Sequence, residues 1–173
     1  MGEIMNNNYI LTVIAKDKPG IVRVLSDIVL SNNGSWLEAS LSRLGGQFAG
    51  IISVKIPNDQ LDNFKEALSA IVEQGISAKI NVIDESTELQ GSESALIMLE
   101  ANDRHGIIEE ISSILAEKGV NVEKLTSVCE SASMAGYELF KAEVKVLLPV
   151  GLTVNDLQTL LEQMSDDLMV TIH

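Results

Sequence analysis

Two short turns carry the residues with the most specific chemistry. In AKDKPGIVRVLSDI, Asp17, Pro19 and Gly20 stand between an apolar run and an amphipathic one, and Asp103 and Gly106 stand in the same way later in the chain. The first amides of a helix have no partner within it, so such a strand-to-helix turn can hold a small anion or an amino acid. The turn can also be scaffolding, in which the acid caps or shapes it and the glycine permits it.

Other reactive residues lack the spacing of a catalytic or metal site. A hydrolase needs a nucleophile beside a base, and nothing in the spacing brings Cys129 together with His105 or His173. The motifs CxxC, HExxH, the Walker loop and GxGxxG are absent from the sequence. The sequence therefore predicts a protein that is not an enzyme and has no catalytic residues, metal or cofactor.

Both turns belong to a repeat that runs through the chain. IAKDKPGIVRVLSDI aligns with EANDRHGIIEEISSI 86 residues later, and apolar residues at i, i+4 and i+7 mark one helix face in each copy. Farther on, Gly34 aligns with Gly119 at an offset of 85, so one connection is a residue shorter. We expect these glycines to end the two helices in left-handed backbone.

Hydrophobic periodicity divides each copy into the same six elements. In the first copy we expect strand Tyr9–Lys16, helix Gly20–Asn33, strands Ser35–Leu44 and Phe48–Ile56, an amphipathic helix over Leu61–Val72 and strand Ile76–Ile83. In the second we expect strand Ala95–Ala101, helix Gly106–Lys118, strands Val120–Glu130 and Tyr137–Leu148, helix Val154–Met164 and strand Leu168–Ile172.

This order predicts an α+β protein of two tandem ferredoxin-like βαββαβ sandwiches. Each would be an antiparallel four-stranded sheet with two helices on one face. The predicted domains are residues 1–84 and 95–173, joined by a polar linker over 85–94.

Charge argues against direct contact with nucleic acid. The chain has 12 basic and 25 acidic residues, a formal charge of −13, whereas duplex DNA is bound chiefly through basic side chains on phosphates. Residues 1–84 have 7 Lys/Arg against 9 Asp/Glu, net −2, and residues 85–173 have 5 against 16, net −11. A basic partner could use the second half, or the surplus acid only keeps the chain soluble.

Location is indicated by what the sequence lacks. No apolar run approaches the roughly 18 residues that a membrane span needs, and the N-terminus has no secretory signal. With Cys129 as the only cysteine, the chain suits a reducing compartment. We expect a cytoplasmic protein without membrane contact.

The paired D-x-P-G and D-x-H-G turns on duplicated βαββαβ units resemble the ACT domain, the small-ligand-binding regulatory module of amino-acid metabolism. The tandem layout, with no catalytic domain attached, and the run GSWLEASLSRLGGQFAG resemble the glycine cleavage system transcriptional repressor family. The resemblance implies a non-catalytic sensor of a small amino acid, glycine first, that modulates transcription of glycine cleavage genes through a DNA-binding transcriptional activator. It leaves open an amino-acid-binding regulatory subunit of a biosynthetic enzyme. Because ACT sheets commonly pair edge to edge, we also expect a homodimer.

The resemblance also implies where a ligand would lie, beside the loop between the first strand and first helix of a unit. The matching positions are Asp17, Pro19, Gly20 and Ile21 in the first unit, and Asn102, Asp103, Gly106, Ile107 and Asn121 in the second. A carboxylate can accept a ligand ammonium, helix amides can hold its carboxylate, and glycine permits close approach. Trp36 occupies the place of Asn121, so the two units should present different pocket walls.

Overall fold

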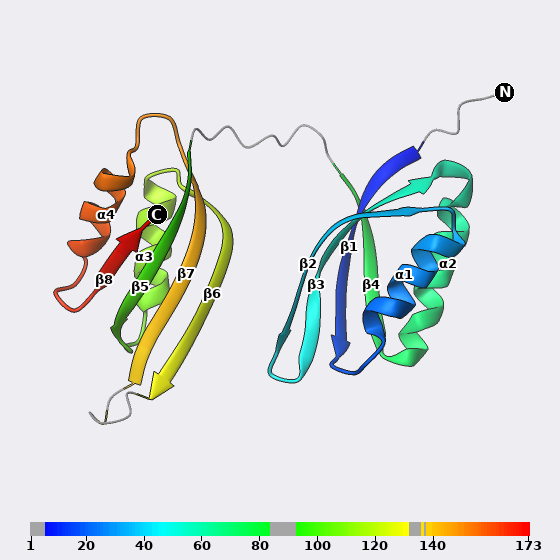
Figure 1. The fold of residues 1–173 in the computed structure, drawn as a ribbon, viewed down its shortest axis with the longest axis horizontal. Coiled ribbons are helices and arrows are strands. Elements are labelled where there is room, and N and C mark those ends of the chain that lie inside the picture. Colours follow the sequence, from blue (N-terminus) through cyan, green and yellow to red (C-terminus); the bar gives the residue numbers. More distant parts are fainter. Residues whose placement is uncertain (1–5, 84–92, 132–135, 137) are drawn as a thin grey trace. The chain divides into compact units, whose positions relative to one another are not determined.

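The computed structural model describes residues 6–83, 93–131, 136 and 138–173. The chain divides into two compact units, Met1–Thr87 and Glu88–His173 (Figure 1). Glu93 and Ser94, expected in the linker, already belong to a strand of the second unit, and the rest of that linker lies outside the described residues.

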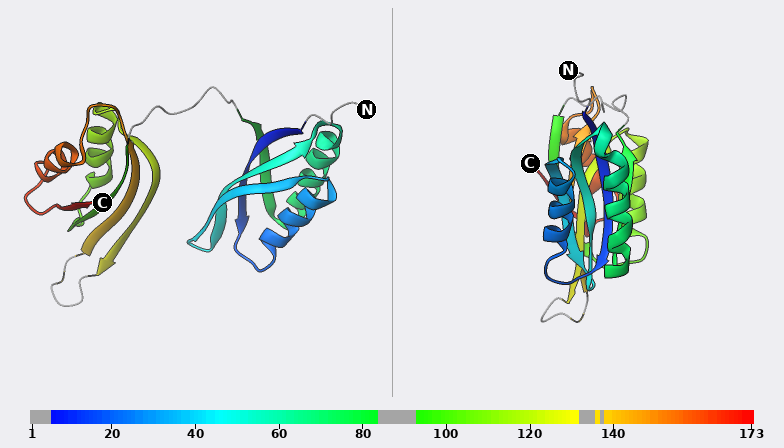
Figure 2. Two further views of the ribbon diagram at one scale, coloured as in Figure 1. Left: turned by 45° about the horizontal axis from the view of Figure 1, so that its top comes forward. Right: turned by 90° about the vertical axis from the view of Figure 1, so that its right-hand side faces the viewer.

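The first unit is a four-stranded antiparallel sheet with strand order β2-β3-β1-β4. Its helices lie on one face of that sheet (Figures 1 and 2). Its elements are β1 (Asn6–Lys16), α1 (Ile21–Ser31), β2 (Ser35–Leu44), β3 (Gln47–Pro57), the 3-10 turn η1 (Asn58–Gln60), α2 (Leu61–Ala70), the 3-10 turn η2 (Ile71–Gln74) and β4 (Ile76–Val82).

The second unit repeats this plan with strand order β6-β7-β5-β8, again antiparallel. Its elements are β5 (Glu93–Asn102), α3 (Ile107–Glu117), β6 (Asn121–Ser131), β7 (Glu138–Leu148), α4 (Val154–Glu162) and β8 (Met169–Ile172). Two tandem ferredoxin-like βαββαβ sandwiches are therefore confirmed.

Each core lies between one sheet face and its helices, because side chains alternate along every strand. In β1 the buried set is Tyr9, Leu11, Val13 and Ala15, and in β7 it is Phe140, Ala142, Val144, Val146 and Leu148. Helix residues spaced three and four apart complete each core, such as Ile107, Ile111 and Leu115 of α3. No helix of the described residues lies on the opposite face of either sheet (Figure 2), and most side chains there are exposed or half-buried.

The end of the second amphipathic helix differs from the prediction. We expected one amphipathic helix over Leu61–Val72, yet Val72 is 56% exposed while Ile71 is buried. The α-helix ends at Ala70 and the chain continues as η2, which has three residues per turn instead of 3.6. Because each residue of the 3-10 turn advances farther around the helix axis, the Val72 side chain points away from the core.

The predicted role of Gly34 is wrong. The left-handed residue after α1 is Asn33, with φ 54°, and its counterpart after α3 is Gly119, with φ 69°. Matching turn hydrogen bonds run from the Asn33 amide to Leu30 O and from the Gly119 amide to Ala116 O, both 3.0 Å. The offset therefore stays at 86 residues, and Gly34 corresponds to Val120.

Position 34 requires glycine because there is no room for a Cβ atom. A Cβ there would lie 2.4 Å from Ile56 Cδ1 and 3.0 Å from the carbonyl oxygens of Lys55 and Val29. The end of α1 and strand β3 thus approach each other so closely that a methyl group does not fit.

We predict that Gly34→Ala destabilises the first unit by about 2 kcal/mol, because the backbone oxygens cannot move aside without disturbing β3. The only tryptophan, Trp36, packs against the first core, so its fluorescence during urea unfolding reports on this unit. Asn33→Gly is the control, because glycine tolerates the left-handed conformation and should change stability by about 0.5 kcal/mol or less. Equal losses from both changes would show that chain entropy, not the clash, governs this turn.

Candidate functional site

The turn between β1 and α1 is built by backbone bonds and one left-handed glycine. The Asp17 amide donates to the Gly46 carbonyl at 2.9 Å, which fixes the end of β1 to the β2–β3 hairpin. Gly20 then adopts φ 93°, and the first helical bond runs from the Val24 amide to the Gly20 carbonyl at 3.0 Å. No side chain caps this helix at Gly20. The amides of residues 21–23 therefore precede the helical bonding pattern and face the turn.

The turn between β5 and α3 has the same construction. The Asp103 amide donates to the Glu138 carbonyl at 2.8 Å, Gly106 has φ 86°, and the Glu110 amide donates to the Gly106 carbonyl at 3.0 Å. Again no side-chain bond caps the helix at Gly106. Neither aspartate side chain therefore caps its helix, which leaves a role in shaping the turn, and among the described residues both helices begin with uncapped amides.

The two aspartates differ in what they contact. Asp17 Oδ2 lies 2.6 Å from Arg43 Nε at the end of β2, and the Asp17 side chain is 28% exposed. Asp103 is exposed, and no ion pair joins it to another residue in the part of the chain that the structure describes. Sequence reasoning missed Arg43, although the Gly45–Gly46 turn, which fixes the hairpin register, could have placed it level with the end of β1.

In the second turn the neighbouring cation, Arg104, is paired with an acid of the same unit. Arg104 donates to both carboxylate oxygens of Glu110, with Nη1–Oε1 2.7 Å and Nη2–Oε2 2.6 Å. This bidentate hydrogen bonding holds the pKa of Glu110 below its ordinary value and raises that of Arg104. The pair ties the turn to the first turn of α3 and partly neutralises the acid there.

Asn102 contributes its backbone to a further contact of this turn. Its amide donates to Asp167 Oδ2 at 3.3 Å, and the Ser165 hydroxyl also donates to the Asp167 carboxylate. The bond from Ser165 lowers the pKa of Asp167, and the Asn102 amide adds to the effect. Asp167 was not foreseen, because 65 residues separate it from Asn102 and only the packing of the chain before β8 brings it near.

Cys129 lies beside the same turn but is a poor nucleophile. It is exposed on β6. Its pKa is raised, first by loss of water contact and then by the Asp103 carboxylate. A raised pKa leaves little thiolate near neutral pH, so the thiol lacks the activation of a catalytic cysteine.

The remaining predicted residues divide by position. Pro19 is exposed within the first turn, whereas Ile21 and Ile107 are only 3% and 5% exposed because their side chains belong to the cores. Only the backbone amides of these isoleucines could meet a ligand.

Asn121 is not brought to the turn of its own unit. It begins β6 after the C-terminal end of α3, and the 11 residues of that helix span about 16 Å. Trp36 is not its counterpart, because both sheets have a bulge in the edge strand, between Trp36 and Glu38 and between Val122 and Lys124. This register matches Trp36 with Val122 and Ser35 with Asn121, so the equivalence of Trp36 and Asn121 is wrong, although the side chains at both positions still differ between the units.

The described residues contain neither a candidate metal site nor a candidate membrane-spanning helix. Within the described ranges no group of three or more His, Cys, Asp or Glu is arranged to hold a metal ion. None of the helices in the described part of the chain is both long and apolar enough to cross a membrane.

Known proteins share this architecture. Residues 8–82 match the ACT domain family model, and no curated protein matches the sequence. An unknown protein from Galdieria sulphuraria aligns with a TM-score of 0.84 at 21% identity, covering 98% of each chain. A candidate glycine cleavage system transcriptional repressor aligns with a TM-score of 0.73 at 13% identity, covering 98% of this chain and 97% of its own. At these identities the likeness establishes the tandem fold.

We predict that Glu110 titrates below the ordinary glutamate value of 4.5 and that Arg104→Met moves its midpoint back toward that value. Because its pKa is lowered on folding, the pair stabilises the turn above the unfolded pKa and ceases to do so as pH falls through the folded one. Side-chain carboxyl NMR over a pH series measures both midpoints. Lys118→Met removes the same charge at the other end of α3 and should leave the Glu110 midpoint unchanged; an equal change would indicate a general field effect.

Proposed function

We propose that this chain, whose residues 8–82 match the ACT domain family model and whose second unit repeats the same fold, is a tandem ACT-domain protein and a non-catalytic sensor of a small amino acid. Glycine is the leading ligand. The protein would act in the cytoplasm as a homodimer and modulate transcription of glycine cleavage genes through a DNA-binding activator.

The observation that carries the sensing role is the juxtaposition at the β5–α3 turn. An exposed aspartate, Asp103, precedes an uncapped helix N-terminus that Gly106 opens in left-handed backbone. Such a turn offers an acceptor for an ammonium group and amide donors for a carboxylate within a few residues. An amino acid is the smallest common ligand that carries both groups, and glycine adds no side chain to accommodate.

The β1–α1 turn is a weaker acceptor for a ligand ammonium group than the β5–α3 turn. The Asp17 charge is already met by Arg43, so an ammonium would have to displace a guanidinium. Its helix has no acid in the first turn, whereas the first turn of α3 has Glu109 in addition to Glu110, which Arg104 pairs. We therefore propose that Asp103 is the principal ammonium acceptor and that Asp17 contributes little.

The transcriptional role is supported by two further facts. The candidate glycine cleavage repressor has the same two-unit fold over nearly its whole length. The net charge of −13 disfavours direct contact with DNA, so regulation would pass through another protein.

We predict that glycine, among the twenty common amino acids, raises the melting midpoint. Binding to the native state alone adds about 2.7 kcal/mol at a hundredfold excess over the dissociation constant, which corresponds to roughly 5 to 10 °C for a chain of this size. Asp103→Asn should weaken binding about tenfold or more by calorimetry, since the amide keeps the shape and loses the charge.

Asp17→Asn is the matched control and should change the glycine affinity less than threefold, or about 0.7 kcal/mol. A larger loss from Asp17→Asn than from Asp103→Asn would reverse the assignment of the two turns. If no amino acid produces heat or a shift of the midpoint, the sensing role is wrong and the turns are scaffolding.

We predict that the purified protein does not retard duplex DNA from a glycine cleavage promoter in a gel shift at moderate salt. Retardation should appear only when a DNA-binding regulator is added, and adding this protein should then change the mobility of that complex. Retardation by the protein alone would contradict the proposal. Co-purification with a biosynthetic enzyme in place of a regulator would favour the enzyme-subunit function.

A further inference from the structure

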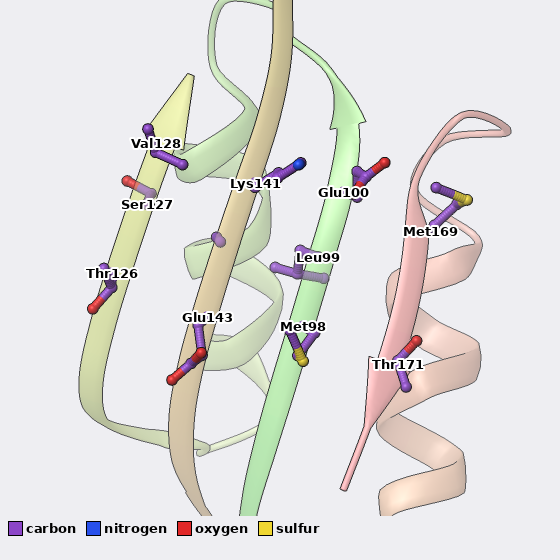
Figure 3. Close-up of a pocket in the computed structure, with 11 residues that line it drawn as sticks. Met98, Leu99, Glu100, Thr126, Ser127, Val128, Lys141, Glu143, Met169 and Thr171 are labelled. Atoms are coloured by element: carbon purple, nitrogen blue, oxygen red, sulfur yellow. The ribbon is translucent and has the colours of Figure 1, made fainter. Parts of the chain in front are cut away.

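A groove of about 460 Å³ crosses the open face of the second sheet, on the side without helices. Figure 3 shows the side chains that line it, on all four strands of this sheet. Met98 and Glu100 come from β5, Lys141 and Glu143 from β7, Val128 from β6 and Met169 from β8. The groove lies on the sheet face and does not include Asp103 or Gly106 of the β5–α3 turn.

Large apolar side chains lie open to solvent in this groove. Met98 is 45% exposed, Val128 48% and Met169 62%. Single exposed apolar side chains are common on protein surfaces, but methionine adapts its shape to varied partners. Met98 and Met169 are therefore suited to contact an apolar side chain.

The charges in the groove are not balanced. Lys141 Nζ lies 2.9 Å from Glu130 Oε2, and Lys145 Nζ lies 3.0 Å from Glu123 Oε2, so both lysines of β7 are paired with β6. Glu143, directly opposite Met98 in the sheet, and Glu100, two residues along β5, are not joined in an ion pair to any described residue, although Lys141 lies directly opposite Glu100 and attracts it. Two carboxylates therefore flank the apolar centre, in a unit that is strongly acidic overall.

The first unit lacks this arrangement. Register places Thr12, Ile14 and Ile51 where the second unit has Met98, Glu100 and Glu143. The hollow on that face is only about 150 Å³. The groove and its carboxylates are thus a property of the second unit and not of the shared fold.

We propose that this groove docks a partner protein through an extended segment with an apolar side chain between two basic ones. Met98 and Met169 would receive the apolar side chain, and Glu100 and Glu143 would receive the basic groups. In an extended chain alternate residues face the same side, so the pattern is basic-x-apolar-x-basic. The proposal concerns a protein surface and holds whether or not the turns bind an amino acid.

The test uses the full chain labelled with ¹³C at the methionine methyl groups and the blocked peptide Lys-Ser-Leu-Ser-Lys. Titration to about 1 mM should shift the Met98 and Met169 methyl resonances in a saturable way. Glu-Ser-Leu-Ser-Glu and Lys-Ser-Ser-Ser-Lys test the charge and the apolar requirement, and each should bind at least tenfold more weakly.

Glu143→Lys should weaken binding about tenfold, and Glu143→Gln by a smaller factor, because the first change adds repulsion to the loss of attraction. Glu38→Lys makes the same charge change on the open face of the first unit and should have no effect. Unshifted Met98 and Met169 resonances, or equal binding of the acidic or the serine peptide, would overturn the proposal. Concentration-dependent shifts of the same methyl groups without peptide would also overturn it, because a second copy would then cover the groove.

Discussion

The left-handed backbone at Gly20 and Gly106 is the constraint on which each unit depends. A central strand must pass into a helix that lies back across the same sheet, and the reversal takes only four residues in each unit. A side chain with a Cβ rarely adopts a φ near 90°, so glycine is needed there for its conformation. No atom would obstruct a Cβ at Gly20 within 4 Å. The same geometry leaves the helix amides uncapped, so folding and candidate binding share one feature.

Burial of only one face of each sheet leaves the sequence of the other face less constrained. Helices cover one side of each sheet, and period-two alternation sends the other half of the strand residues to the open side. On that side the sequence is free to differ between units without loss of the fold. The two units accordingly keep the same cores and turns and differ in the side chains of the open face, such as Thr12 and Met98.

Local patterns in the sequence were sufficient to predict the fold, but they did not predict which side chains contact one another at the candidate site. Alternation predicted the buried face of β7, and the repeated glycine and aspartate predicted equivalent turns. The contact of Arg43 with Asp17 depends on hairpin register, which the Gly45–Gly46 turn indicates only indirectly. The contact of Asp167 with Asn102 depends on long-range packing, which no local pattern encodes. The mispairing of Gly34 with Gly119 shows a related limit, because identical residues were aligned although one serves close packing and the other a left-handed turn.

The bulges in β2 and β6 have a consequence for aggregation. Both strands lie at the edge of their sheets, where unpaired backbone groups can add a strand from another molecule. A bulge at the same place in each, after Trp36 and after Val122, interrupts the regular ladder that such addition requires. The opposite edge of the second unit is β8, with only four residues, and offers little length for pairing. The edge strand β4 has seven residues and no bulge in its pairing with β1, so it offers the longer regular edge for such addition.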